Sequence, residues 1–249
     1  MQIAPTQAQA AARPGSKQAG RKAYWAGIRF LLFGRAVPAA LFGAMTWIQF
    51  VKLTGSLRNL PPSPTMSLVT SHIVSPALYT AFCSIPVVLY LTRPRPKARD
   101  ARRVAWMAAF AGTTVQLLVG TLLGSGPMLF NPPRALSEMG VALAVIAVTG
   151  AVWSLGTLRR SLSVIPEARR LVTRGPYRLV RHPLYLFEIL AALAVLLGEP
   201  GAIATGTFAV LVALQVTRAR MEENLLAATF PEYSTFRRST RYRLIPRVW

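Results

Sequence analysis

Long apolar stretches alternate with short polar and strongly basic stretches along the whole chain. A helix needs roughly 20 apolar residues to span the hydrocarbon core of a bilayer. Four stretches have that length: residues 28–51, 68–92, 104–123 and 139–158. The pattern predicts a transmembrane helix at each of these positions.

Two shorter apolar stretches follow, at residues 184–197 and 202–217, and the turn signal Gly198-Glu199-Pro200-Gly201 separates them. They predict a helical hairpin whose two ends return to the same side of the membrane. At a rise of about 1.5 Å per residue, the first helix of this hairpin covers only about 21 Å. The hairpin is therefore expected to be tilted, flanked by snorkelling residues or incompletely spanning. The predicted fold is an all-α polytopic membrane protein with about six hydrophobic helices.

The composition supports this prediction. Of the 249 residues 53% are hydrophobic, yet the formal net charge is +21. The 29 Lys and Arg residues lie in short clusters between the apolar stretches rather than in one basic domain. This distribution argues against nucleic-acid binding and favours contact with membrane lipids.

The positions of the basic residues also predict an orientation, because Lys and Arg are enriched in cytoplasmic loops. If the helices alternate in direction, 25 of the 29 basic residues fall on one side of the membrane. They lie in the segment up to Arg29, in residues 93–103, in residues 159–181, and from Arg218 onward. The predicted topology therefore has both termini in the cytoplasm.

Three regions follow from these patterns. Residues 1–27 are rich in Ala, Gln and Gly, with scattered basic residues and no apolar period, so a disordered basic tail is expected. The first apolar stretch begins too late and runs too long for a cleaved signal peptide, and the helix is expected to be retained. Residues 28–149 form an N-terminal group of transmembrane helices, and residues 150–249 form a C-terminal region with the hairpin.

Several common kinds of site are absent from the sequence. The two histidines, His72 and His182, are far apart and neither has a carboxylate cluster beside it, so no metal site is expected. The single cysteine, Cys83, lies in an apolar stretch and is interpreted as a buried hydrophobic residue. There is no phosphate-binding loop, dinucleotide fingerprint or nucleophile elbow. The predicted spans before residue 158 contain no Asp or Glu, which argues against ion-coupled transport.

Polar residues are concentrated instead in residues 171–185. Gly175-Pro176 interrupts any helix, whereas Pro183 suits the first turn of the next one. The unpaired amides of a helix start attract anions, and Arg181 and His182 add positive charge at this point. A small anionic group such as a carboxylate would therefore bind here.

Two tyrosines flank this helix start. Tyr177 and Tyr185 could present their ring faces to a cationic group of a ligand. The alternative interpretation is a basic interfacial loop with two tyrosines in the aromatic belt of the membrane.

A second polar stretch, residues 218–223, follows the hairpin and lies at the same membrane surface. Arg218 and Glu222 are four residues apart and share one helix face. They form either an exposed ion pair of small energy or part of a site, in which Glu222 and Glu223 balance a bound cation while Arg218 holds an anionic substrate. The chain contains only eight acidic residues, so two adjacent ones are conspicuous.

At these residues the sequence resembles the isoprenylcysteine carboxyl methyltransferase family of integral membrane methyltransferases, which use S-adenosylmethionine. The resemblance covers about residues 150–246 and rests on four short motifs around an apolar hairpin, in the same order and at similar spacing. They are Leu-Val-Thr-x-Gly-x-Tyr at 171–177, Arg-His-Pro-x-Tyr at 181–185, Glu-Glu at 222–223, and the pair Phe-Pro-Glu-Tyr at 230–233 and Arg-Leu-Ile-Pro at 243–246.

The resemblance implies a cofactor pocket at the cytoplasmic surface and a lipophilic substrate that enters from the bilayer. Arg218 would face the substrate, and Glu222 would contact the cofactor from the side opposite to the motif residues. The implied cofactor contacts are Arg169, Arg170, Leu171, Val172, Tyr177, His182, Pro183, Leu184, Tyr185 and Glu222.

One position departs from the family, because Phe187 stands two residues after the motif tyrosine, where family members commonly have Gly. The phenyl ring would tighten a contact between helices or make the pocket shallower. This departure therefore puts the substrate class in doubt more than the cofactor. Glu188, beside it, points either into the pocket or to the membrane interface.

The residues leave the methyl acceptor open. A carboxylate needs no general base and would be held by Arg218, with Glu222 offsetting the surplus positive charge. An amine or thiol must lose a proton, and Glu222 or Glu223 is then the candidate base. Two other functions compete: a membrane reductase of lipid or sterol double bonds that uses a nicotinamide cofactor, and a transporter or scaffold that binds anionic lipid through its basic face.

Overall fold

The computed structural model of the chain describes residues 14–63, 69–100, 102–163 and 167–249. Within these residues, four helices are long and apolar enough to cross a membrane. They are Tyr24–Arg58, His72–Thr92, Arg134–Ser161 and Ala202–Thr229. With a single two-stranded sheet among the described residues, the chain is an all-α polytopic membrane protein, as predicted.

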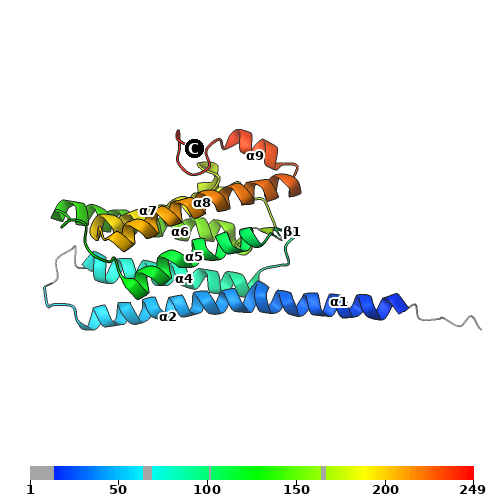
Figure 1. The fold of residues 1–249 in the computed structure, drawn as a ribbon, viewed down its shortest axis with the longest axis horizontal. Coiled ribbons are helices and arrows are strands. Elements are labelled where there is room, and N and C mark those ends of the chain that lie inside the picture. Colours follow the sequence, from blue (N-terminus) through cyan, green and yellow to red (C-terminus); the bar gives the residue numbers. More distant parts are fainter. Residues whose placement is uncertain (1–13, 64–68, 101, 164–166) are drawn as a thin grey trace, which may run out of the picture.

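The helices form an elongated bundle and run roughly along its long axis (Figure 1). The first two, joined by a π-helical turn at Leu32–Ala36, make one long rod. The helices, in chain order, are α1 (Pro14–Leu31), α2 (Val37–Arg58), α4 (Ser75–Thr92), α5 (Arg103–Leu123), α6 (Arg134–Leu158), α7 (Pro183–Gly198), α8 (Ala202–Thr229) and α9 (Tyr233–Ser239).

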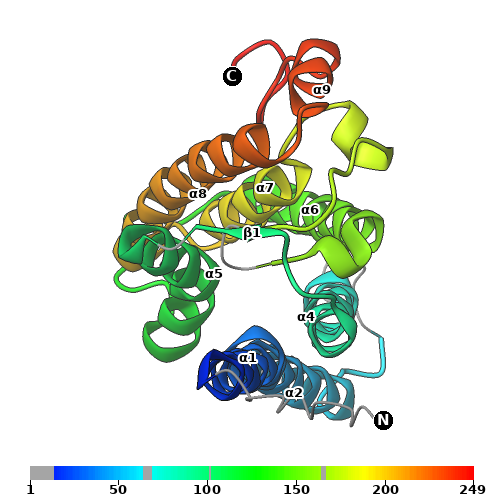
Figure 2. The same ribbon diagram turned by 90° about the vertical axis from the view of Figure 1, so that its right-hand side faces the viewer.

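Each helix packs mainly on one or two neighbours around a central space. Helix α2 packs on α4, α4 also packs on α6, α6 packs closely on α7, and α8 contacts both α7 and α5. Seen along the bundle, the helices form an open ring in which α5 and α2 are its two ends (Figure 2). One hydrophobic cluster contains residues of α2, α4, α6 and α7. The expected boundary between the N-terminal helices and the C-terminal region, at residue 150, lies inside α6, which is part of this shared core.

The contact between α6 and α7 depends on small residues. Gly140, Ala147, Gly150 and Ala151 are buried on α6, and Ala192 and Ala194 are buried on α7. A Cβ on Gly140 would lie 2.8 Å from the carbonyl oxygen of Ala194. Small residues let helix backbones approach closely, which is how helices associate in a membrane without a hydrophobic driving force.

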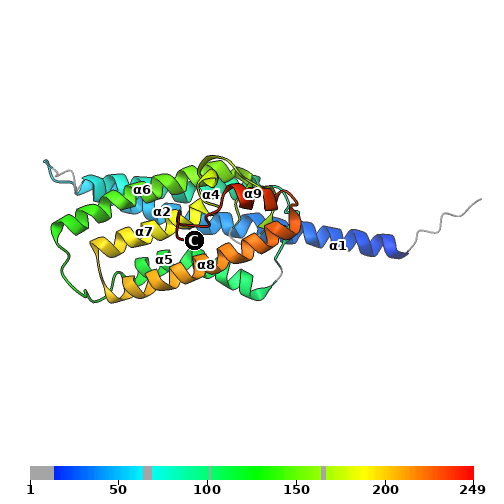
Figure 3. The same ribbon diagram turned by 90° about the horizontal axis from the view of Figure 1, so that it is seen from above.

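The prediction of a disordered tail is wrong for residues 14–27, which belong to helix α1. Helix α1 extends beyond the end of the bundle (Figures 1 and 3). It continues directly into the first span because Leu31, Ala36 and Val37 all have helical backbone angles. Residues 1–13 lie outside the described part of the chain.

The hairpin also differs from the prediction. Helix α7 is short, as expected, with 16 residues. Helix α8 has 28 residues and continues through the polar stretch to Thr229, instead of ending near residue 217. At about 1.5 Å per residue it is about 42 Å long, enough to cross the bilayer and project beyond it. Helix α5 has the predicted position, and its crossing of the membrane stays a prediction.

The basic segments lie together at one end of the bundle. The strands β1 (Ala98–Arg99) and β2 (Glu167–Ala168) pair antiparallel and join the loop before α5 to the loop after α6. At the opposite end, Met128 bridges to Gly201, and the amide of Leu129 donates to the carbonyl of Pro200. At each end of the bundle, loops that are distant in the sequence thus contact each other.

Candidate functional site

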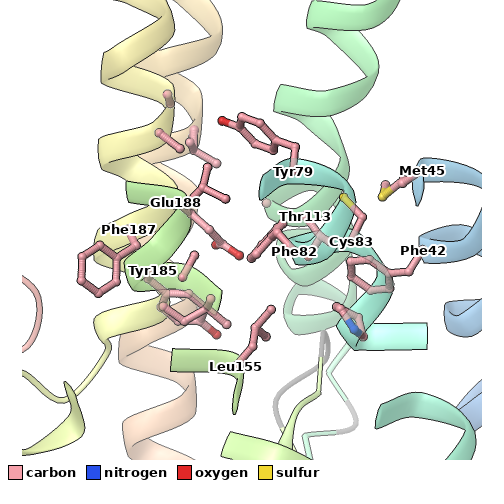
Figure 4. Close-up of a pocket in the computed structure, with 18 of the residues that line it drawn as sticks. Phe42, Met45, Tyr79, Phe82, Cys83, Thr113, Leu155, Tyr185, Phe187 and Glu188 are labelled. Atoms are coloured by element: carbon pink, nitrogen blue, oxygen red, sulfur yellow. The ribbon is translucent and has the colours of Figure 1, made fainter. Parts of the chain in front are cut away.

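A cavity of about 410 Å³ lies between the helices of the bundle. Its walls come from α2, α4, α5, α6, α7 and α8, together with residues of the loop after α6. Figure 4 shows apolar side chains on the α2 and α4 side, among them Phe42, Phe82 and Cys83, facing Tyr185 and Glu188 of α7. Cys83 is buried, as the sequence predicted.

The first turn of α7 forms one wall of the cavity at its basic end. The helix begins at Pro183, and His182 occupies the position before it with non-helical backbone angles. The amides of Arg181 and His182 donate to the carbonyls of Tyr242 and Arg243, each at 2.9 Å. The amides of the first helical turn have no carbonyl one turn earlier to bind, so this helix start can receive an anionic group.

Glu223 anchors this helix start and does not line the cavity. Arg181 donates through Nε to Glu223 Oε1 at 2.6 Å, and Arg243 donates through Nε to Glu223 Oε2 at 2.9 Å. Arg181 also donates to the carbonyls of Thr240 and Arg241. Because Glu223 and Arg181 are both buried, this network ties α8, the start of α7 and the C-terminal segment into one unit.

Glu222, by contrast, faces the cavity. Tyr185 Oη donates to Glu222 Oε2 at 3.0 Å, and His182 Nδ1 lies 3.7 Å from the same oxygen. The other ring nitrogen of His182, Nε2, lies 3.3 Å from Glu223 Oε1. The rings of His182 and Tyr185 are parallel, with centroids 5.5 Å apart. The two adjacent acids therefore have different surroundings, joined by one histidine.

Tyr177 reaches the cavity from the loop before α7. Gly175 has a φ of +60°, and a Cβ there would lie 2.9 Å from the hydroxyl of Thr157. This loop conformation therefore depends on glycine. Burial, and then the negative charge of Glu222, raise the pKa of Tyr177 well above its ordinary value. Tyr177 thus remains a neutral phenol at physiological pH.

Arg218 is buried and lines the cavity. Its guanidinium lies over the ring of Tyr185, with Cζ 4.6 Å from the centroid, and Nη1 donates to Gln215 Oε1 at 2.9 Å. The amide of Gln215 in turn donates to Glu188 Oε2 at 2.6 Å. A Cβ on Gly112 of α5 would lie 2.9 Å from Arg218 Cδ, so the glycine makes room for this side chain.

A second charged cluster surrounds Glu167 in strand β2. Arg99 donates through Nε to Glu167 Oε1 at 2.6 Å, Arg169 Nη2 lies 2.6 Å from Oε2, and Ser163 also donates to Oε2. Arg93 Nη1 lies 3.5 Å from the same carboxylate. Burial acts to raise the pKa of Glu167, but Arg169, Ser163 and the other arginines outweigh it, so the pKa lies below its ordinary value.

The structure brings together six of the residues predicted for the site. The cavity lining includes Tyr177, His182, Leu184, Tyr185, Arg218 and Glu222. Pro183 stands at the helix start beside them.

The stretch 169–172 lies elsewhere. Arg169 binds Glu167 and donates to the carbonyl of Pro94 at 3.0 Å, while Arg170 is exposed. Leu171 packs against the apolar cluster around Phe230. In this structure none of the four, Arg169, Arg170, Leu171 and Val172, is among the residues that line the cavity, and their contact with a cofactor stays a prediction.

The sequence did not assign a role to several residues that line the cavity. From the sequence, Glu188 could point either into the pocket or to the membrane interface. In the structure it lines the pocket. Gln215, a buried amide within an otherwise apolar stretch, was also missed; it does not line the cavity but binds two residues that do, Glu188 and Arg218. The contributions of α2, α4 and α5, such as Met45, Tyr79 and Thr113, had no sequence signal, because apolar and small polar residues occur throughout those helices.

Among the residues that the structure describes, no group of three or more His, Cys, Asp or Glu side chains is arranged to hold a metal ion.

Two comparisons with known proteins match part of the chain. The cobalt-zinc-cadmium resistance protein CzcN of Cupriavidus metallidurans is 29% identical over 136 residues, which are 54% of this chain. The match spans 59% of the length of that relative. Residues 134–233, which include α6, α7, α8 and all of the cavity residues on these helices, match the family described as phospholipid methyltransferase.

Proposed function

We propose that this protein is an integral membrane methyltransferase that transfers a methyl group from S-adenosylmethionine to a lipophilic acceptor held within the bilayer. The observation that carries the proposal is the meeting of Tyr177, His182, Tyr185, Arg218 and Glu222 at one cavity. The similarity of residues 134–233 to the phospholipid methyltransferase family supports the same reaction class.

The residues at the basic end of the cavity suit the chemistry of this cofactor. S-adenosylmethionine combines a carboxylate with a sulfonium cation. The start of α7 offers unpaired amides for the carboxylate. Glu222 offers a negative charge for the cation, and the rings of Tyr177 and Tyr185 offer π faces. Opposite charges of the ligand thus meet matching groups on adjacent walls.

Methyl transfer is an in-line displacement, for which the cofactor supplies an activated methyl group. The protein's task is to hold the acceptor nucleophile in line with that group and to exclude water. Tyr185 donates to Glu222 and packs under Arg218, so its ring and hydroxyl are held from both sides. His182 lies between Glu222 and Glu223, with one ring nitrogen near each carboxylate. It thus links Glu222, which faces the ligand, to Glu223, which anchors the helix start.

The acceptor enters, in this proposal, from the lipid between α2 and α5. Helix α5 packs mainly on α8, and α2 packs mainly on α4, which leaves these two helices as the ends of the open ring (Figure 2). Phe42 and Met45 of α2 and Thr113 of α5 are the residues of these two helices that would meet the acceptor in the cavity. An acyl or prenyl chain could follow these apolar walls while its polar group reaches Tyr185.

Equilibrium binding of radiolabelled S-adenosylmethionine to the full chain, purified in detergent, tests the proposal. We expect saturable binding that falls at least tenfold in affinity in the Glu222→Gln and Tyr185→Phe variants. Glu138→Gln is the control, because Glu138 is an exposed acid that does not line the cavity, and this variant should bind as the wild type does. No saturable binding to the wild type, or equal loss in the control, would reject the proposal. Binding of a nicotinamide dinucleotide instead would support the reductase alternative.

A further inference from the structure

A second hollow, of about 280 Å³, lies in the C-terminal segment. Four arginines line it together with aromatic and apolar residues: Arg181, Arg241, Tyr242, Arg243, Arg247, Val248 and Trp249. Among the described residues, this lining has none in common with that of the cavity between the helices. The hollow is therefore separate from the proposed methyl-transfer site.

The backbone brings these arginines together by folding the C-terminal segment back on itself. The amide of Arg243 donates to the main-chain oxygen of Trp249 at 2.9 Å, and the amide of Trp249 donates to the carbonyl of Ile245 at 3.1 Å. Arg247 lies within this turn with a φ of +66°, a left-handed conformation that arginine adopts less readily than glycine. The turn places Arg243 and Arg247 in the lining of the same hollow.

The hollow carries a surplus of positive charge. Glu223 binds Arg181 and Arg243 from behind, and no acidic residue is among the described residues that line the hollow. Arg241 and Arg247 are exposed, and within the described part of the chain neither side chain has an ion-pair or hydrogen-bond partner. Like charges held close together repel one another, so a bound anion would relieve the repulsion.

Arg243 is held in a position that suits an anion receptor. Its Nε donates to Glu223 Oε2 at 2.9 Å, and its Cζ lies 4.8 Å from the centroid of the Trp249 ring. These contacts fix the plane of the guanidinium and leave its two Nη groups without a hydrogen-bond partner among the described residues. A planar guanidinium with free N–H groups can bind two oxygens of a phosphate at once.

The position of the hollow along the bundle is close to the level of the lipid headgroups. The apolar part of α8 ends at about residue 217, and Glu223, which binds Arg243, lies about 9 Å farther along the helix. The headgroup region extends roughly 5–8 Å beyond the hydrocarbon core, within reach of an arginine side chain at that level. The C-terminal end lies beside α7 and α8, on the outside of the ring (Figures 1 and 2).

Apolar side chains beside the arginines favour a lipid over a free anion. Ile245 and Val248 are both exposed, and Val248 lines the hollow. Trp249 lies between two guanidinium groups, those of Arg220 and Arg243. Tryptophan is enriched at membrane interfaces, and exposed apolar residues next to basic ones are typical of segments that bind a bilayer surface.

We infer that this hollow binds the phosphate group of an anionic phospholipid and thereby anchors the C-terminal segment to the membrane surface. The site does not depend on the proposed methyl transfer, since its residues lie outside the cavity. The bound lipid also holds the segment against the start of α7, because the amides of Arg181 and His182 donate to the carbonyls of Tyr242 and Arg243.

Limited proteolysis of the full chain in lipid nanodiscs tests the site on the wild type. The discs contain dioleoyl phosphatidylcholine alone or with about one fifth dioleoyl phosphatidylglycerol, and mass spectrometry follows cleavage by trypsin. We expect phosphatidylglycerol to slow cleavage after Arg241 and Arg247 about fivefold. Cleavage after Arg237 and Arg238 of α9, which are exposed and outside the hollow, should not change. Equal slowing at all four positions, or none, would overturn the inference.

A pair of double variants tests the same site by lipid retention. Native mass spectrometry counts the phosphatidylglycerol molecules that stay bound when the protein is released from the discs. Arg241→Gln/Arg247→Gln should retain about one molecule fewer than the wild type. Arg237→Gln/Arg238→Gln, which removes the same charge at the same end of the bundle, should retain as many as the wild type. Equal loss in both variants would show attraction by charge alone and reject a built site.

A soluble probe separates a lipid from a free phosphate. Glycerol 1-phosphate, which has the phosphate but no acyl chain, is added to the wild type in discs of phosphatidylcholine alone. We expect no protection after Arg241 and Arg247 at millimolar concentration. Protection equal to that by phosphatidylglycerol would mean that the ligand is a soluble phosphate and would overturn the lipid assignment. The two experiments on the wild type decide the matter even if a double variant does not fold.

Discussion

The ring of Phe187 lies directly against Gly150, in the space that a side chain on that glycine would occupy. Phe187 is the residue at which the sequence departs from the methyltransferase family that it resembles, whose members commonly have glycine there. In this chain the small residue is on α6 and the large one on α7, so the helices still approach closely. Figure 4 shows the Phe187 ring turned away from Glu188. Phe187 is also one of the residues that line the cavity, so the departure affects both the helix contact and the cavity wall.

Gly150→Ala should destabilise the protein, because the added methyl group overlaps the Phe187 ring. Overpacking of this kind typically costs about 1–3 kcal/mol. The double variant Gly150→Ala/Phe187→Ala should recover part of that loss, since the smaller side chain frees the space. Thermal unfolding in detergent measures both effects. Gly156→Ala on the same helix is the control, because a Cβ there meets no atom within 4 Å. Equal destabilisation by both alanines would contradict the packing argument.

Glu222 and Glu223 should respond differently to the same substitution. Glu223→Gln leaves Arg181 buried without its ion-pair partner, and breaking such a buried pair costs about 3–5 kcal/mol. The C-terminal segment should then become sensitive to limited proteolysis after Arg237 or Arg241. Glu222→Gln should leave proteolysis unchanged and weaken S-adenosylmethionine binding. Identical proteolysis of the two variants would show that Glu223 and Glu222 do not have separate structural and cofactor-binding roles.

Acidification should destabilise the protein through Glu167. Its pKa in the folded state is lowered, so its contribution to stability is fully present above the ordinary value of 4.5. That contribution is lost as the pH falls through the folded-state pKa. The unfolding midpoint of the wild type should therefore fall between pH 6 and pH 3 more steeply than that of Glu167→Gln, which lacks the titrating group. Parallel pH curves for the two proteins would exclude this role.

The orientation of the bundle can be tested with reporter fusions. The basic end, with β1, β2 and the C-terminal segment, is expected to face the cytoplasm because of its Lys and Arg content. Fusions after residues 97, 170 and 249 should report a cytoplasmic position, and a fusion after residue 130 the opposite side. Residue 199, in the turn between α7 and α8, should report the opposite side or a buried position. A cytoplasmic signal at residue 130 would reverse the assignment.

Much of the fold could be predicted because length and apolar content alone define a membrane helix. The start of α7 could also be predicted, since Pro183 and the preceding Gly175-Pro176 have strong local conformational preferences. The pairing of Arg218, Glu222 and Tyr185 at one surface followed from the hairpin, which returns both of its ends to the same side.

Other features depend on contacts between distant residues. The different surroundings of Glu222 and Glu223 could not be predicted, because Arg243 reaches Glu223 only through the fold of the C-terminal segment. The position of Arg169 against Glu167 depends on the pairing of two-residue strands that have no sequence pattern. The length of α8 was underestimated because apolar content, and not helix propensity, was used to place its end.

The backbone pairing of Arg181 and His182 with Tyr242 and Arg243 also sets an order of events during synthesis. The apolar helices can enter the bilayer one after another as they leave the ribosome. The wall of the cavity that carries His182 cannot take its final form until residue 243 has been made, some 60 residues later along the chain. A nascent or truncated chain would thus occupy the membrane as an inserted but inactive protein, and activity would begin only when translation has passed this point.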